Sequence, residues 1–191
     1  YLGRDYPQLT TVDLVCHGVP SPAVLRAFVE ELERRLSPDL TPEHLLAASA
    51  QAVAAANGAI RAAAEEVEDY QNMGTTLVAA VACDQGVAVT NVGDSRAYHI
   101  NEDGITRLTR DHSVVEDMVA RGDITPEEAR THPRKNLITR ALGSEERIRA
   151  DLYEKELQPG DFLLLCSDGL SNIVTDQELL YEAIHGGEPS K

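Results

Sequence analysis

The stretch of sequence that says most about the fold is Pro159–Asn172, which reads PGDFLLLCSDGLSN. Its segment Phe162–Cys166 is apolar throughout and predicts a strand held in the core. Asp168 follows the end of this strand and precedes Gly169, so its carboxylate would be fixed by the core and still able to meet a ligand. Carboxylates are ligands that hard cations such as Mg²⁺ and Mn²⁺ prefer. Aspartate followed by glycine is also typical of a helix cap or a tight turn, and this alternative stays open.

Two more aspartates stand where a predicted strand ends in a turn. Asp94 lies in NVGDSR and Asp111 lies in TRDHS. Short β-branched segments separated by Gly, Asp and Asn surround them, which is typical of antiparallel hairpins. The predicted strands are Thr76–Cys83, Val87–Val92, Ala97–Ile100 and Ile105–Leu108, followed by a predicted strand pair, Asp151–Leu157 and Asp161–Cys166.

Helices are predicted on both sides of these strands. Three capping boxes, in which Glu follows Ser or Thr by three residues, mark helix starts at Ser113, Thr125 and Thr175. Nearer the N-terminus, a strand at 11–16 precedes helices at 21–36 and 41–67. Two helices, then a mainly antiparallel sheet, then further helices predict a layered α+β domain.

Composition excludes several classes of function. The 191 residues include 17 Lys and Arg against 32 Asp and Glu, a net charge of −15. This excess of negative charge argues against binding to nucleic acid or to an anionic membrane. No apolar run approaches the ~20 residues that span a bilayer. The 3 cysteines are far apart and form no CxxC pair, so we expect a reducing, cytoplasmic setting without disulfides or zinc.

Five motifs then occur in a fixed order: MGTTLVAA from Met73, NVGDSRAY from Asn91, LTRDHSVV from Leu108, HPRKNLITRALG from His132, and PGDFLLLCSDGLSN from Pro159. In this order they closely resemble the protein phosphatase 2C family, the metal-dependent (PPM-type) Ser/Thr phosphatases, in its bacterial form. The resemblance covers residues 37–191. It implies an α-β-β-α sandwich of two antiparallel sheets flanked by helices, and two Mn²⁺ or Mg²⁺ ions, with a third bound more weakly, that activate water to attack phosphorus.

The resemblance assigns roles residue by residue. Asp168, with Gly169 beside it, matches a metal-binding aspartate, and Asp111 matches a ligand of the third, weaker cation. Asp94 and Arg96 match a motif that we interpret as a pair stabilising a turn.

Residues 112–140 match a flap beside the active site, which includes His112, His132 and Arg134. Both histidines are candidates for acid–base catalysis, but no motif places them near phosphate. The basic run Arg130, Arg134, Lys135 and Arg140 has two interpretations: attraction of a phosphoprotein, or pairing with the chain's own acids.

The family pattern is incomplete at both ends of the chain. The early motif DGMGG, whose aspartate bridges both metal ions, is absent, and the chain reaches Lys191 before the segment that supplies a further metal aspartate. We therefore expect a domain truncated at both ends, with weak cation binding and impaired hydrolysis.

Residues 1–36 carry a resemblance of their own. The string CHGVPSP from Cys16 resembles a segment of the deazaflavin (coenzyme F-420) hydrogenase/dehydrogenase beta-subunit family, which predicts a boundary near residue 37. Strand, turn and helix also fall where a phosphatase has strand, Asp-Gly, turn and helix. His17 would then stand near the position of the bridging aspartate as a low-ranked metal ligand; the alternative is a solvated turn residue.

Three functions follow from these patterns. The first is a protein serine/threonine phosphatase, acting as a monomer on targets of a bacterial Ser/Thr kinase. The second is a catalytically inactive domain of the same fold that binds phosphoprotein. The third is a deazaflavin hydrogenase accessory protein, against which stands the absence of iron–sulfur cysteine clusters.

Overall fold

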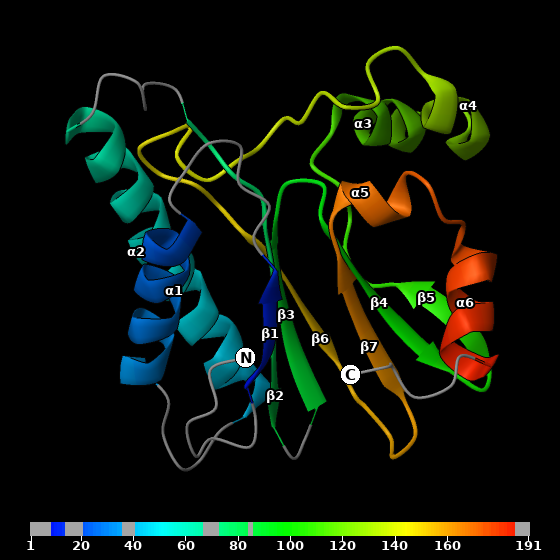
Figure 1. Cartoon of the computed structure of the whole chain (residues 1–191), viewed down its shortest axis with the longest axis horizontal. Helices are drawn as coiled ribbons and strands as arrows, with labels where there is room; N and C mark the ends of the chain where they lie inside the picture. The colour runs from blue at the N-terminus through cyan, green and yellow to red at the C-terminus, as the bar shows by residue number, and fades with distance from the viewer. Residues whose placement is uncertain (1–8, 14–20, 36–40, 67–72, 84–85, 186–191) are drawn as a thin grey trace.

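The protein has four layers (Figure 1). In the computed structural model, the described residues are 9–13, 21–35, 41–66, 73–83 and 86–185. Two antiparallel sheets lie face to face in the middle. Helices α1 (Ser21–Arg35) and α2 (Pro42–Glu66) cover one sheet, and α6 (Asp176–His185) covers the other. The predicted α-β-β-α arrangement is confirmed.

Each sheet is antiparallel throughout. The first has the order β1-β2-β3-β6 and consists of β1 (Leu9–Asp13), β2 (Leu77–Cys83), β3 (Gly86–Val92) and β6 (Asp151–Lys155). The second has the order β5-β4-β7 and consists of β5 (Gly104–Arg107), β4 (Arg96–Asn101) and β7 (Phe162–Cys166). Three short helices lie at one end of the sandwich: α3 (Val114–Arg121), α4 (Pro126–Thr131) and α5 (Asp168–Ser171).

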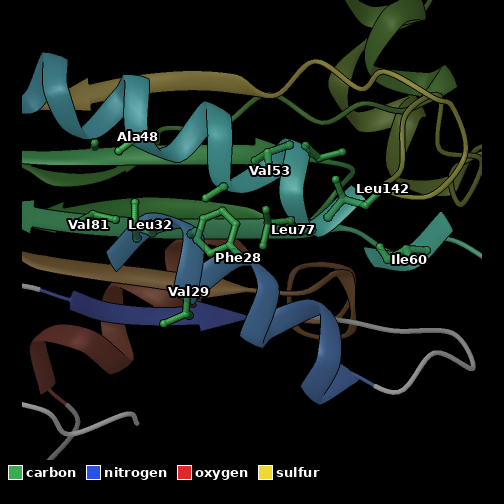
Figure 2. Packing of buried hydrophobic residues seen from close by; sticks show 14 of the residues in the cluster. Phe28, Val29, Leu32, Ala48, Val53, Ile60, Leu77, Val81 and Leu142 are labelled. Carbon is green, nitrogen blue, oxygen red and sulfur yellow. The ribbon is translucent and has the colours of Figure 1, made fainter. Parts of the chain in front are cut away.

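The core follows from alternation along the strands, because successive side chains of a strand face opposite sides. One set of β2 residues packs toward the helices together with Phe28 and Leu32 (Figure 2): Leu77, Ala79 and Val81. The other set packs between the sheets: Val78 and Ala80. On the far side, Tyr98 and Ile100 of β4 pack with Leu179 of α6. These three apolar layers hold the four layers of backbone together.

Two turns that the sequence predicts to close hairpins connect strands of different sheets. Gly93–Ser95 joins β3, in the first sheet, to β4, in the second. Likewise β6 pairs with β3 while β7 pairs with β4, so the predicted strand pair of 151–157 and 161–166 is wrong. A turn signal locates a turn but does not identify the next strand's partner, which depends on the faces buried between the sheets.

The N-terminal segment forms part of the sandwich. Strand β1 pairs antiparallel with β2, at the edge of the first sheet. Helix α1 packs beside α2, and its Phe28 and Leu32 are completely buried. His17 lies outside the described residues. None of the helices in the described part of the chain is long and apolar enough to cross a membrane.

Candidate functional site

The strand-end aspartates meet at one edge of the second sheet. Strands β4 and β7 are antiparallel neighbours, and Arg96 at the start of β4 is paired with Cys166 at the end of β7. Asp94 lies two residues before Arg96, and Asp168 lies two residues after Cys166. The register therefore places both aspartates beyond the same edge, although 74 residues separate them in sequence (168 − 94).

A cleft of about 850 Å³ opens over this edge. Asp94, Asp111 and Asp168 line it, together with residues of α3, α4, α5 and the start of α6. Ligand sites in proteins commonly have volumes of ~300–1,000 Å³. The cleft is therefore large enough for a phosphorylated side chain with its neighbouring residues.

Glycine at position 93 allows the crossover that carries Asp94. Its backbone φ of +108° is one that residues with a side chain rarely adopt. A Cβ at this position would lie 2.4 Å from Cγ2 of Thr76. Thr76 in turn shares a 2.9 Å hydrogen bond with the hydroxyl of Ser95. The turn is thus packed tightly against the start of β2, which fixes the backbone on which Asp94 stands.

Arg96 pairs with Asp111, not with Asp94. Its Nε and Nη2 donate to the Asp111 carboxylate at 3.0 and 2.6 Å, and both side chains are largely buried, at 19% and 7% exposed. Burial opposes the charge of Arg96, but the hydrogen bonds with Asp111 outweigh it and raise the pKa of the guanidinium. The ion pair of Arg96 is with Asp111 because the loop before α3 returns Asp111 to the guanidinium. The interpretation of Asp94 and Arg96 as a pair that stabilises the turn stays a prediction. Asp111 holds Arg96 with the same oxygens that a third cation would need.

Asp94 stands in a region of excess negative charge. Its pKa is raised by burial first, and then by the nearby charges of Asp168 and Asp111. Asp168 makes a weak contact of 3.3 Å with the amide of Asn172, one turn of helix further on. Ser171 also lines the cleft, and its buried hydroxyl has no hydrogen-bond partner. Carboxylates that repel each other beside an unsatisfied hydroxyl fit a cation and its water ligands.

The described residues supply only part of a metal site. Within the described ranges, no group of three or more His, Cys, Asp or Glu side chains could hold a metal ion. Of the acids that line the cleft, Asp111 and Glu116 are paired with Arg96 and Arg107. Asp94 and Asp168, which carry no ion pair within the described ranges and whose charges act on each other, are the candidates to hold one.

His112, at the start of the flap, does not line the cleft. Its Nδ1 accepts a hydrogen bond from the backbone N–H of Gly93 at 3.0 Å, so the proton of the neutral ring is on Nε2, 3.2 Å from Asp151. The N–H of His112 also donates to the carbonyl of Gly93 at 2.9 Å. His132, in the flap, accepts through Nδ1 from the N–H of Arg134 at 3.1 Å. Nδ1 of each histidine is thus occupied by a hydrogen bond from a backbone N–H group.

The buried ring of His112 makes stability depend on pH. Burial lowers its pKa below 6.5 despite the hydrogen bond with Asp151, with the charge of Arg140 acting in the same direction as burial. The unfolded chain therefore binds a proton more readily, and stability falls as pH drops below about 6.5. We expect the melting temperature to fall by a few degrees between pH 7.5 and 5.5, because ~1 kcal/mol corresponds to about 2–4 °C in a chain of this size. His112→Gln should reduce this loss, and His132→Gln should not; equal losses in all three proteins would refute the assignment.

The flap closes on itself at its base. Ser113 forms an isolated bridge with Ile138, and the N–H of Thr139 donates to the carbonyl of His112 at 2.8 Å. Arg140, at the end of the flap, donates to Asp151 of β6 at 2.7 Å. Between these ends lie α3 and α4, which stand above α5 in Figure 1. The predicted flap of 112–140 thus has both ends tied to the first sheet.

The sequence did not reveal every residue of the cleft. Ser171 lies on α5, a helix of one turn that has no capping box and is not predicted from the sequence. Arg107, at the end of β5, pairs with Glu116 of α3 at 2.8 Å and ties the flap to the second sheet. The separation of nine residues spans a strand end and a helix start, so no helical spacing rule could have found this pair.

Comparisons with known proteins identify relatives of this chain. The model of the family described as Protein phosphatase 2C matches residues 17–185. The chain is 47% identical over 116 residues to serine/threonine phosphatase stp of Listeria innocua, which is 61% of this chain and 46% of that protein. It is 43% identical over 136 residues to PstP of Mycobacterium tuberculosis, which is 71% of this chain and 26% of that protein. The chain thus spans about half the length, or less, of these curated relatives.

Solved structures show the same fold. Serine/threonine phosphatase Stp1 from Staphylococcus aureus superposes with a TM-score of 0.79 at 35% identity, over 92% of this chain and 72% of that one. The catalytic domain of PstP, in complex with two manganese ions, superposes with a TM-score of 0.73 at 35% identity, over 88% and 70%. The family match begins at residue 17 and therefore includes α1, while the boundary near residue 37 stays a prediction.

Proposed function

The chain belongs to the protein phosphatase 2C family, and we propose that it hydrolyses phosphoserine and phosphothreonine on proteins with the help of Mn²⁺ or Mg²⁺. The observation that carries the proposal is the meeting of Asp94 and Asp168 in one cleft beneath the flap. The complex of the PstP catalytic domain with two manganese ions supports the choice of cation.

The chain's own residues have distinct tasks in this proposal. Asp94 and Asp168 would hold the cation, which when bound lowers the pKa of water and neutralises charge on the phosphoryl group. Arg96 and Asp111, which line the cleft, stabilise it through their largely buried ion pair. In this arrangement Asp111 is a positioning residue. A third, weaker cation on Asp111 would have to compete with Arg96 for the same oxygens.

Removing one carboxylate tests the proposal. We expect Asp168→Asn to lower phosphate release from a phosphothreonine peptide in Mn²⁺ by on the order of 10²-fold or more. The reason is that loss of a residue that only hydrogen-bonds to a metal ligand already costs ~10–100-fold in activity, and Asp168 would be a ligand itself. Asp103→Asn, in the turn at the opposite end of β4, makes the same chemical change and should leave the rate unchanged. Mn²⁺-dependent release that survives in Asp168→Asn would show that other residues hold the cation.

The second candidate is an inactive domain of the same fold that binds phosphoprotein. It is favoured by the lack, within the described ranges, of a cluster of three metal-binding side chains. Background rates in Mn²⁺ for the unaltered chain, combined with measurable binding of the phosphothreonine peptide, would support it. Weak cation binding is expected in either case, because cation affinity falls with the number and charge of the ligands.

The finer predictions belong to the same proposal. We propose that the substrates are targets of a bacterial Ser/Thr kinase and that the protein acts as a monomer in the cytoplasm. The resemblance of residues 1–36 to the deazaflavin hydrogenase family, and the role of His17, stay predictions. The pairing of β1 with β2 and the burial of α1 support a phosphatase role for this segment.

A further inference from the structure

Two cations of the flap line the cleft without an ion-pair partner. Arg130, near the end of α4, and Lys135, in the turn that follows, both line it and are exposed. Neither side chain forms an ion pair or a hydrogen bond within the part of the chain that the structure describes. Arg140, from the same basic run, pairs with Asp151. The two interpretations of the basic run therefore apply to different residues.

The other cations of the cleft are neutralised. Arg96 is bound by Asp111, and Arg107 is bound by Glu116 at 2.8 Å. In a chain with a net charge of −15, acidic side chains are abundant and could have paired with the flap cations as well. Arg130 and Lys135 are thus positive charges left available at a site where a substrate would lie.

Acidic and basic side chains both line the cleft, and Glu116 and Glu127 of the flap lie on the same wall as its cations. Asp94 and Asp168 lie at the strand edge, whereas Arg130 and Lys135 lie on the flap. The charge of Arg130 also reaches α6, because it contributes, after the hydrogen bonds from Thr175, to the lowered pKa of Glu178. A phosphoryl group bound at the strand edge would therefore have its neighbouring residues beside the flap cations.

The turn after α4 fixes Lys135 in this position. The N–H of Lys135 donates to the carbonyl of His132 at 3.0 Å, and the N–H of Leu137 donates to the carbonyl of Arg134 at 3.0 Å. Arg134 stands next to Lys135 and is exposed, yet it does not line the cleft. The turn thus places Lys135 at the cleft and leaves Arg134 outside it.

We infer that Arg130 and Lys135 bind an anionic side chain of the substrate close to the phosphorylated residue, so that the flap selects acidic phosphopeptides. This inference rests on the proposed function and names its substrate class. An extended peptide advances about 3.3 Å per residue, so an anion within about three residues of the phosphorylated one stays within the cleft. The anion is the carboxylate of Asp or Glu or a second phosphate.

Three phosphothreonine peptides test the inference. They are identical except for one position, two residues after the phosphothreonine, which is Gln, Glu or a second phosphothreonine. Their dissociation constants are measured by fluorescence anisotropy with the full chain in Mn²⁺, at 50 mM and 300 mM salt as chosen conditions. Turnover of p-nitrophenyl phosphate, which has no neighbouring residues, is measured in parallel. The variants are Arg130→Gln/Lys135→Gln and the matched control Arg134→Gln.

The unaltered chain should bind the Glu or the doubly phosphorylated peptide about 5–10-fold more tightly than the Gln peptide, and the tighter of the two identifies the anion. Salt should weaken this preference, because exposed charges are screened. The double variant should lose the preference, and Arg134→Gln should keep it, with unchanged turnover of p-nitrophenyl phosphate in both. Equal binding of all three peptides by the unaltered chain, or an equal loss of preference in Arg134→Gln, would overturn the inference. Absence of all turnover would refute the proposed function alone, because the binding measurements do not depend on it.

Discussion

Replacing Arg96 by methionine should lower the free energy of unfolding by about 3–5 kcal/mol, because it leaves the Asp111 carboxylate buried without its partner. Asp111 is 7% exposed, and its neighbour Arg107 is 3.8 Å away, too far to replace the hydrogen bonds from Arg96. The measurement is urea unfolding at pH 7. Methionine keeps most of the apolar stem of arginine, so the loss reports on charge rather than on packing.

Two further variants isolate this effect. Arg96→Met combined with Asp111→Leu should recover most of the lost stability, because an apolar pair of similar volume often replaces a buried ion pair without cost. Arg121→Met removes an exposed partner of Asp123, with side chains 66% and 50% exposed, and should cost less than about 1 kcal/mol. If Arg96→Met costs no more than Arg121→Met, the Arg96–Asp111 pair does not brace the site.

Deletion of residues 1–35 should leave a chain that aggregates or melts far below the full chain. It removes β1, so β2 becomes an unpaired sheet edge, and such edges promote association. It also removes Phe28 and Leu32, both completely buried against α2 and the first sheet. The measurements are size-exclusion chromatography and the melting temperature.

Point variants give the same test on a folded chain. Leu32→Ala should cost about 2–5 kcal/mol through the cavity that it leaves. Arg26→Ala, on the exposed side of the same helix, should cost little. A shortened chain that stays soluble and melts at the temperature of the full chain would mean that residues 1–35 are an appendage to the phosphatase domain.

Local patterns predicted most elements of this fold. The capping boxes at Thr125 and Thr175 form as expected, each glutamate accepting from the threonine N–H at 2.8 Å. Predicted strand limits such as Val87–Val92 differ by a residue or so from those observed. These features depend on neighbours in sequence, which is why they can be found without a structure.

The site was harder to predict because its contacts are not local. Asp168 and Asp94 were both singled out as strand-end acids, but their meeting depends on the pairing of β4 with β7. The ion-pair partner of Arg96 is Asp111, 15 residues away in sequence, and no motif indicates this contact. Sequence distance is a poor guide wherever the chain changes sheets, as it does at Gly93–Ser95.

The crossover at Gly93–Ser95 makes the cleft depend on how the two sheets are aligned. Asp94 stands on the segment that leaves the first sheet, while Asp168 begins α5, two residues after a strand of the second. The distance between them therefore depends in part on the layer between the sheets, where Ala80 and Ala97 pack with larger side chains such as Leu163 and Tyr153. A larger residue in that layer would push the sheets apart and change the spacing of the aspartates without touching the cleft. The geometry of the cleft and the volume of the inner core are thus linked in this chain.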